Sequence, residues 1–188
     1  MRAKFLLCLG FGALVSSNWA SAQSEDQPGI TYDCDTAANH FSELILPTPS
    51  APFSVTGRVK LMSLAESKEY LPLTRLSVSQ HSAEGEPSVG DWAGFEFLVA
   101  PTKKGRKPDL PLLAFSEMLN GEKHDSDFAG EPSGMEVPFR LSYDGTTAVT
   151  QLDGHEKRMA FTASTPIVRI LCSTGEFLYR DLKVAPLD

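Results

Sequence analysis

Apolar and polar residues alternate along most of the chain. Residues 53–61 show it most clearly, because apolar side chains occupy most odd positions and polar side chains the even ones. Such a period of two buries one face and leaves the other in water, which predicts a β-strand. A short stretch at 41–46 is apolar enough to pack, and further strands are predicted at 73–80, 92–100, 110–118, 137–143, 148–152, 167–173 and 177–184.

Turn-forming pairs separate several of these segments: Asn120-Gly121, Asp144-Gly145, Asp153-Gly154 and Thr174-Gly175. Asp144-Gly145 lies between two alternating segments and therefore predicts a β-hairpin. Residues 61–70 form the one predicted helical turn outside the N-terminal region. A series of short strands with no helices between them predicts an all-β fold, an antiparallel sandwich or barrel.

The N-terminal region has the pattern of a secretory signal peptide. Basic residues Arg2 and Lys4 precede an apolar run over 5–15, and Ala20-Ser21-Ala22 supplies a small-residue cleavage site. The run is shorter than the roughly 20 residues that cross a bilayer. We therefore expect cleavage after residue 22, export to a periplasm or the extracellular space, and no transmembrane span in the mature chain. A lead-in at 23–31 would precede one β-sandwich domain at 32–188.

Removal of the signal peptide also changes the cysteine count. Cys8 is lost, and Cys34 and Cys172 remain. An even number of cysteines in an exported protein predicts a disulfide. By closing a long loop, the disulfide would restrict the unfolded chain and so stabilise the fold by roughly 5 kcal/mol. The alternative is two buried free thiols.

The mature chain would be acidic, with 15 basic and 24 acidic residues and a formal net charge of −9. This charge excludes nucleic acid as an expected partner, since proteins that bind phosphate backbones present basic surfaces. One segment differs, because Lys103, Lys104, Arg106 and Lys107 gather four positive charges. Two interpretations stay open: an anion-binding loop for a polymer or lipid headgroup, or a solvated hairpin tip.

The C-terminal third carries a resemblance to a known family. Val137-Pro-Phe-Arg-Leu-Ser-Tyr-Asp-Gly is followed by Gln151-Leu-Asp-Gly, by the strand at 167–171, and by Gly175-Glu-Phe-Leu-Tyr-Arg-Asp-Leu-Lys-Val. This succession resembles the closing strands of the concanavalin A-like lectin/glucanase superfamily. The resemblance implies an antiparallel jelly roll whose terminal segments share a sheet, which fits a Cys34–Cys172 link. It also implies recognition of a glycan or cell-envelope polymer.

The candidate ligand-binding residues are Trp92, Tyr143, Asp125 and Asp127. An exposed aromatic face stacks on the apolar face of a sugar, and carboxylates accept hydrogen bonds from its hydroxyls. The alternative for both aromatic residues is a place in the core. Asp125 and Asp127 lie in a Gly- and Pro-containing segment that predicts a solvated acidic loop, with a weak cation site or a catalytic pair as alternatives.

No catalytic, metal or cofactor motif appears. The retaining glucanases of the resembled superfamily carry Glu-x-Asp-x-x-Glu on one strand, and this pattern is absent. We therefore expect an exported, non-catalytic sandwich that binds a glycan or envelope polymer and needs no cofactor and no metal. The alternatives are a structural or protein-interaction component of the envelope, and a polysaccharide hydrolase with a site assembled from scattered loops.

Overall fold

The computed structural model describes residues 29–65, 67, 69–81, 90–100, 110–124 and 127–187, and these residues form strands and no helix. The strands are β1 (Ile30–Leu46), β2 (Phe53–Leu64), β3 (Leu73–Gln80), β4 (Trp92–Ala100), β5 (Leu110–Leu119), β6 (Glu122–His124), β7 (Phe128–Gly130), β8 (Val137–Tyr143), β9 (Thr147–Leu152), β10 (His155–Ala160) and β11 (Pro166–Pro186). All their pairings are antiparallel. The predicted all-β antiparallel sandwich is confirmed.

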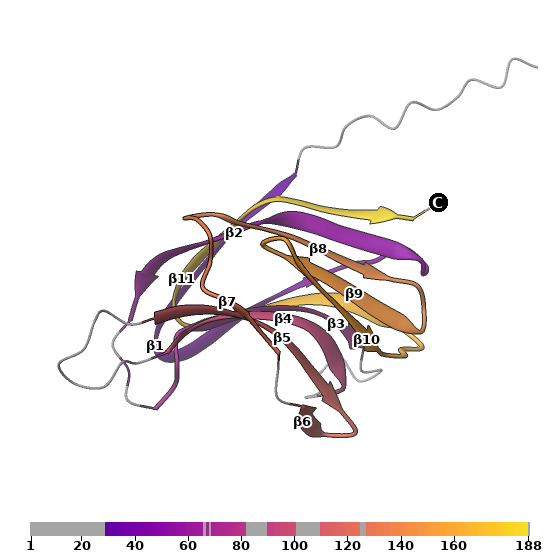
Figure 1. Cartoon of the computed structure of the whole chain (residues 1–188), viewed down its shortest axis with the longest axis horizontal. Coiled ribbons are helices and arrows are strands. Elements are labelled where there is room, and N and C mark those ends of the chain that lie inside the picture. Colours follow the sequence, from indigo (N-terminus) through magenta and orange to yellow (C-terminus); the bar gives the residue numbers. More distant parts are fainter. Residues whose placement is uncertain are drawn as a thin grey trace, which may run out of the picture.

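One long strand, β11, takes part in both layers of the sandwich (Figure 1). Its first half pairs with β3 and its second half with β2. β1 runs along the other side of β11 and pairs with both halves. We call the layer of β3, β4, β5 and β6 with the first half of β11 the front sheet. The back sheet contains β10, β9, β8 and β2 with the second half of β11.

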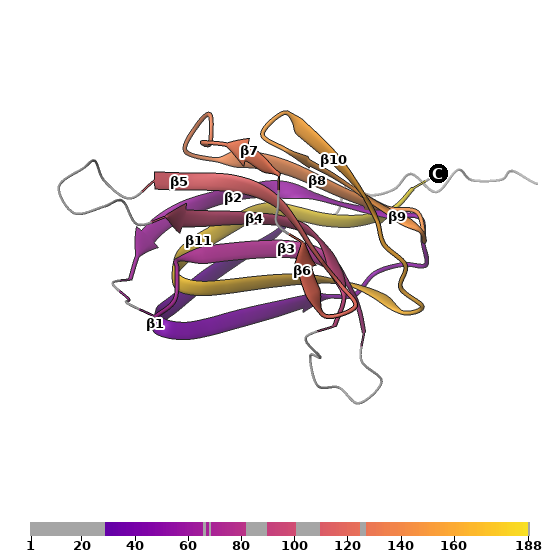
Figure 2. The same cartoon turned by 60° about the horizontal axis from the view of Figure 1, so that its bottom comes forward.

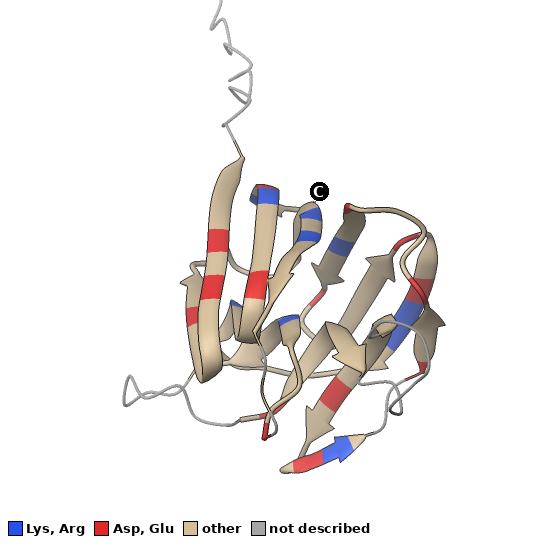
Figure 3. Ribbon diagram, turned by 90° about the vertical axis from the view of Figure 1, so that its left-hand side faces the viewer, with Lys and Arg blue, Asp and Glu red and all other residues tan. Residues whose placement is uncertain are grey.

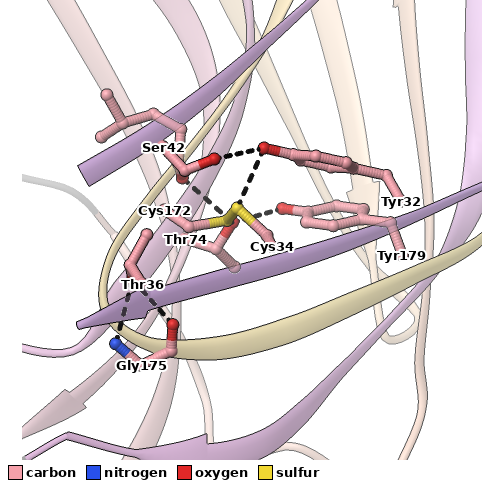
Figure 4. Close-up of a disulfide and its surroundings, with 9 residues drawn as sticks. Tyr32, Cys34, Thr36, Ser42, Thr74, Cys172, Gly175 and Tyr179 are labelled. Atoms are coloured by element: carbon pink, nitrogen blue, oxygen red, sulfur yellow. Dashed lines mark hydrogen bonds between the residues drawn. A yellow bond between two sulfur atoms is a disulfide. The ribbon is translucent and has the colours of Figure 1, made fainter. Parts of the chain in front are cut away.

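The middle of β11 corrects two predictions. Thr174-Gly175 bends the strand but does not reverse the chain, and Thr174 has a φ of 56°. The predicted helical turn fails because β2 continues to Leu64, which pairs with Gly175. The Thr36 hydroxyl donates to the Gly175 carbonyl at 2.7 Å and accepts from its N–H at 3.1 Å (Figure 4). Residues 61–64 thus bond their backbone groups to β11 and not within a helical turn.

The core lies between the two sheets. Phe139 of β8 contacts Phe95 of β4, with ring centroids 5.1 Å apart, and Tyr179 of β11, at 5.9 Å. The Cys34–Cys172 disulfide joins β1 to β11, has an S–S distance of 2.01 Å, and is fully buried. The predicted disulfide and the predicted meeting of the terminal segments are therefore confirmed.

Hydroxyl groups surround the disulfide (Figure 4). The Thr74 hydroxyl donates to the Leu171 carbonyl at 3.0 Å, so the Tyr179 hydroxyl, 2.6 Å away, donates to Thr74. Burial raises the pKa of Tyr179. The Tyr32 hydroxyl lies 3.4 Å from Cys34 Sγ and is the donor, since a disulfide sulfur carries no hydrogen. These bonds satisfy buried hydroxyls and fix the junction of β1, β3 and β11.

The β8–β9 connection confirms the hairpin predicted at Asp144-Gly145. Asp144 Oδ1 accepts hydrogen bonds from the backbone N–H groups of Thr146 and Thr147, both at 2.8 Å. Bonds to the charged form favour it, so they hold the pKa of Asp144 below its ordinary value. Gly145 has a φ of 106°, in the region that favours glycine.

Candidate functional site

The outer face of the front sheet, which points away from the sandwich core, carries the candidate site. Successive side chains of a strand point to opposite faces. Leu76, Phe95 and Leu113 belong to the core. Arg75 of β3 and Glu96 of β4, which pair directly, therefore lie on the outer face.

Small residues form the floor of this face. Ser77, Gly94 and Ser116 are paired across β3, β4 and β5, and each is buried. A Cβ added at Gly94 would lie 2.0 Å from the Leu76 carbonyl oxygen, so glycine is required by the close approach of β3. Ser116 Oγ is buried and has no hydrogen-bond partner among the described residues. The floor therefore consists of small buried residues, one of which carries a hydroxyl without a described partner.

Two cations converge on one carboxylate above this floor. Lys123 Nζ of β6 lies 3.1 and 3.2 Å from the two carboxylate oxygens of Glu96, and both are hydrogen-bond distances. Arg75 Nη1 lies 3.7 Å from the same carboxylate. Burial lowers the pKa of Arg75 and Glu96 opposes that shift, while an arginine still keeps its proton at neutral pH. Figures 1 and 2 show the β5–β6 hairpin, which carries Lys123, projecting on this side of β3 and β4.

Trp92 lies on the same face but is covered, which corrects the prediction of an exposed aromatic ring. It pairs with Ser79 and Met118, is absent from the cluster between the sheets, and is 2% exposed. The guanidinium carbon of Arg75 lies 4.0 Å from the centroid of the Trp92 ring. This is a cation–π contact. Trp92 therefore supports Arg75, and its ring has no free face for a sugar.

Tyr143 belongs to the core, so its predicted contact with a ligand is also corrected. The residue is 1% exposed, and its ring packs against Phe53 and Phe161. Its hydroxyl donates to the Gly145 carbonyl at 2.8 Å and accepts from the Ala163 N–H at 2.8 Å. The first hydrogen bond lies within the β8–β9 hairpin and the second ties the hairpin to the segment after β10, so the role of Tyr143 is structural.

The structure describes one of the two predicted ligand carboxylates, Asp127. Asp127 forms an ion pair with Lys157 of β10, where the edges of the two sheets meet, and this contact raises the pKa of Lys157. Asp125 lies outside the described residues, as do residues 1–28 and Lys103, Lys104, Arg106 and Lys107. Within the described part of the chain, no three His, Cys, Asp or Glu side chains gather as a metal site would require.

A hollow of about 430 Å³ lies on the outer face of the back sheet. Arg140, Gln151 and Glu156 line it from one row across β8, β9 and β10. The Gln151 side-chain amide donates to Glu156 at 2.9 Å, and Asp153 accepts from Ser133. Gln151 and Glu156 are exposed. This hollow is open to solvent, and its polar side chains lie at the surface.

Sequence reasoning missed Arg75, Glu96 and Lys123. The signal for the first two was present, because Arg75-Leu-Ser77 and Trp92-Ala-Gly-Phe-Glu96 place polar or small residues at alternate positions of two predicted strands. The sequence could not show that these strands are neighbours in the sheet. Lys123 follows a predicted turn, and nothing local indicates that it reaches Glu96.

Comparisons with known proteins give likeness of fold without likeness of sequence. No protein-family model matches the chain, and no curated protein matches it. A functionally unknown protein from Saccharomyces cerevisiae superposes with a TM-score of 0.54 and 13% identity, over 84% of this chain and 88% of that one. The carbohydrate recognition domain of Emp46p in its metal-free form gives 0.53 and 13%, over 84% and 83%. Alginate lyase AlyC3 in complex with dimannuronate gives 0.52 and 10%, over 84% and 75%.

Among the described residues no helix is long and apolar enough to span a membrane.

The order of the strands, the curled antiparallel layers and the structural neighbours agree with one another. The chain has the concanavalin A-like jelly-roll fold that the C-terminal resemblance implied.

Proposed function

We propose that this protein is an exported, non-catalytic carbohydrate-binding module whose ligand binds on the outer face of the front sheet. The observation that carries the proposal is the group of Arg75, Glu96 and Lys123 over a floor of small residues. A ligand site needs a few fixed polar groups that set orientation. Trp92 and Glu96 fix Arg75 by a ring contact and an ion pair.

The structural neighbours support a saccharide as the ligand. Emp46p's domain is a carbohydrate recognition domain, and AlyC3 was solved with dimannuronate. A fold alone does not assign a function, so the site chemistry has to agree. Arginine and lysine supply the hydrogen-bond donors that sugar hydroxyls and carboxylates accept.

The chemistry of the face supports binding rather than glycoside hydrolysis. Glycoside hydrolases generally need two carboxylates on either side of the scissile bond. Among the described side chains of β3, β4 and β5 that point to this face, Glu96 is the one acid, and Lys123 and Arg75 neutralise it. A general acid would need a free carboxyl group here.

Export is supported by two features. The N-terminal basic, apolar and small-residue pattern is that of a cleaved signal peptide. The buried Cys34–Cys172 disulfide fits an oxidising compartment. A periplasmic or extracellular module of this kind meets the glycans and polymers of a cell envelope.

The test is a glycan and envelope-polymer binding screen of the exported protein, purified after expression of the full chain. Arg75→Gln removes a donor from the proposed site, and Arg140→Gln makes the same change on the outer face of the back sheet. Both variants are first checked for cooperative unfolding. We expect Arg75→Gln to lose binding and Arg140→Gln to retain it. Absence of binding to a broad panel, or equal loss in the two variants, would refute the proposal.

A further inference from the structure

We infer that the outer face of the front sheet selects acidic saccharides, those bearing carboxylate or sulfate groups, over their neutral counterparts. The inference rests on the proposed function and adds the chemical class of the ligand. It depends on an asymmetry in what Arg75, Glu96 and Lys123 expose to solvent.

The acid of this group is the least accessible member. The Glu96 side chain is 5% exposed, compared with 16% for Arg75 and 46% for Lys123. A ligand that approaches the face therefore meets an ammonium and the edge of a guanidinium before it can reach the carboxylate. The surface that it meets is cationic, although the chain as a whole is acidic.

The group of Arg75, Glu96 and Lys123 by itself carries one cation in excess, and the nearby Asp91 carboxylate accepts from the Gly121 N–H at the turn of the β5–β6 hairpin. Arg75 and Lys123 share the single carboxylate of Glu96. On the neighbouring strands of the same face, Arg169 of β11 is paired with Glu43 of β1 and adds no net charge. The next residues across the floor are serines and glycine. An anionic ligand would balance the excess cation of this group, whereas a neutral sugar would not.

Both cations keep donors for a ligand. An ammonium has three N–H donors and a guanidinium has five. Lys123 Nζ contacts the Glu96 carboxylate, and nearly half of the Lys123 side chain remains exposed. Stacking on Trp92 limits the rotation of Arg75, so its planar donors are held in one orientation. Hydrogen bonds from charged donors to a carboxylate are stronger than those to a hydroxyl.

The experiment compares ligands that differ only in charge. Oligogalacturonate is measured against fully methyl-esterified oligogalacturonate, and dextran sulfate against dextran, by titration calorimetry on the exported protein. We expect at least one acidic member to bind about tenfold more tightly than its neutral partner. The ratio should shrink between 0.05 and 0.5 M salt, roughly the range in which screening becomes strong. The carboxylate and sulfate arms distinguish the two anion sources.

Three variants place the selectivity. Lys123→Gln should reduce the acidic-to-neutral ratio toward one, and Lys123→Arg should keep it. Lys60→Gln, the same charge change on β2 of the back sheet, should leave it unchanged. Equal affinity for acidic and neutral members would overturn the inference but leave the proposed function standing, while no binding to any ligand would overturn the proposed function. Selectivity that survives Lys123→Gln would also overturn the inference.

Discussion

The outer faces of the two sheets carry similar residues in different surroundings. On the back sheet, Glu136 contacts Arg58 and Arg180, and their side chains are 29%, 60% and 50% exposed. On the front sheet, Glu96 makes the same kind of contact with two cations but is 5% exposed. Both faces thus place one acid between two bases, and only the front face encloses it.

The difference teaches that burial, and not residue type, separates a solvated charge group from a candidate site. Exposed ion pairs gain little, because water screens the charges and the long side chains lose rotational freedom. An enclosed carboxylate is removed from water and depends on its partners. Figure 3 shows that acidic and basic residues occur on strands throughout the molecule, so the positions of charged residues do not by themselves locate the site.

The largest expected effect is on stability and comes from Trp92→Ala. This change removes a buried indole and the platform for Arg75, and truncation of a buried aromatic residue costs about 3 kcal/mol or more. Urea unfolding followed by circular dichroism measures the change in free energy. Tyr70→Ala is the control, because Tyr70 is 58% exposed and should change stability little. Equal effects of the two substitutions would show that Trp92 does not support the face.

Glu96→Gln and Glu136→Gln test directly whether the two faces differ. Glu96→Gln leaves Arg75 and Lys123 without a counter-charge and should lower the free energy of unfolding by about 2 kcal/mol. Glu136→Gln makes the same change among exposed partners and should cost about 0.5 kcal/mol or less. Parallel urea titrations of both variants give the two values. A larger loss for Glu136→Gln would mean that the enclosed and the open groups have been assigned the wrong way round.

The smallest effect is expected at Asp144, in the β8–β9 hairpin of the back sheet. The folded pKa of Asp144 is lowered, so its charged form stabilises the fold above the ordinary aspartate pKa of about 4. This contribution is lost as the pH falls through the folded pKa. Asp144→Asn should therefore be slightly less stable than the original at pH 7 and equally stable at about pH 2. Thermal unfolding at both pH values measures this, and a difference that persists in acid would contradict it.

Most strands were predictable because their alternation is strong. The segments at 73–80, 92–100 and 137–143 coincide with β3, β4 and β8. β10 was missed because His155–Ala160 carries four polar or charged residues at its start and so lacks clear alternation. It is a strand because it pairs with β9 and closes the edge of the sheet.

The sequence by itself determined the strand pattern, the acidic charge, the disulfide partners and the likeness to a jelly roll. Each of these depends on residue type or local spacing, and a period of two is visible without knowledge of neighbours. Only the tertiary structure decided that Trp92 and Tyr143 are buried, and that Arg75, Glu96 and Lys123 meet. Burial and contact depend on strand order and sheet curvature, and these follow from long-range pairing with β11 that no local pattern encodes.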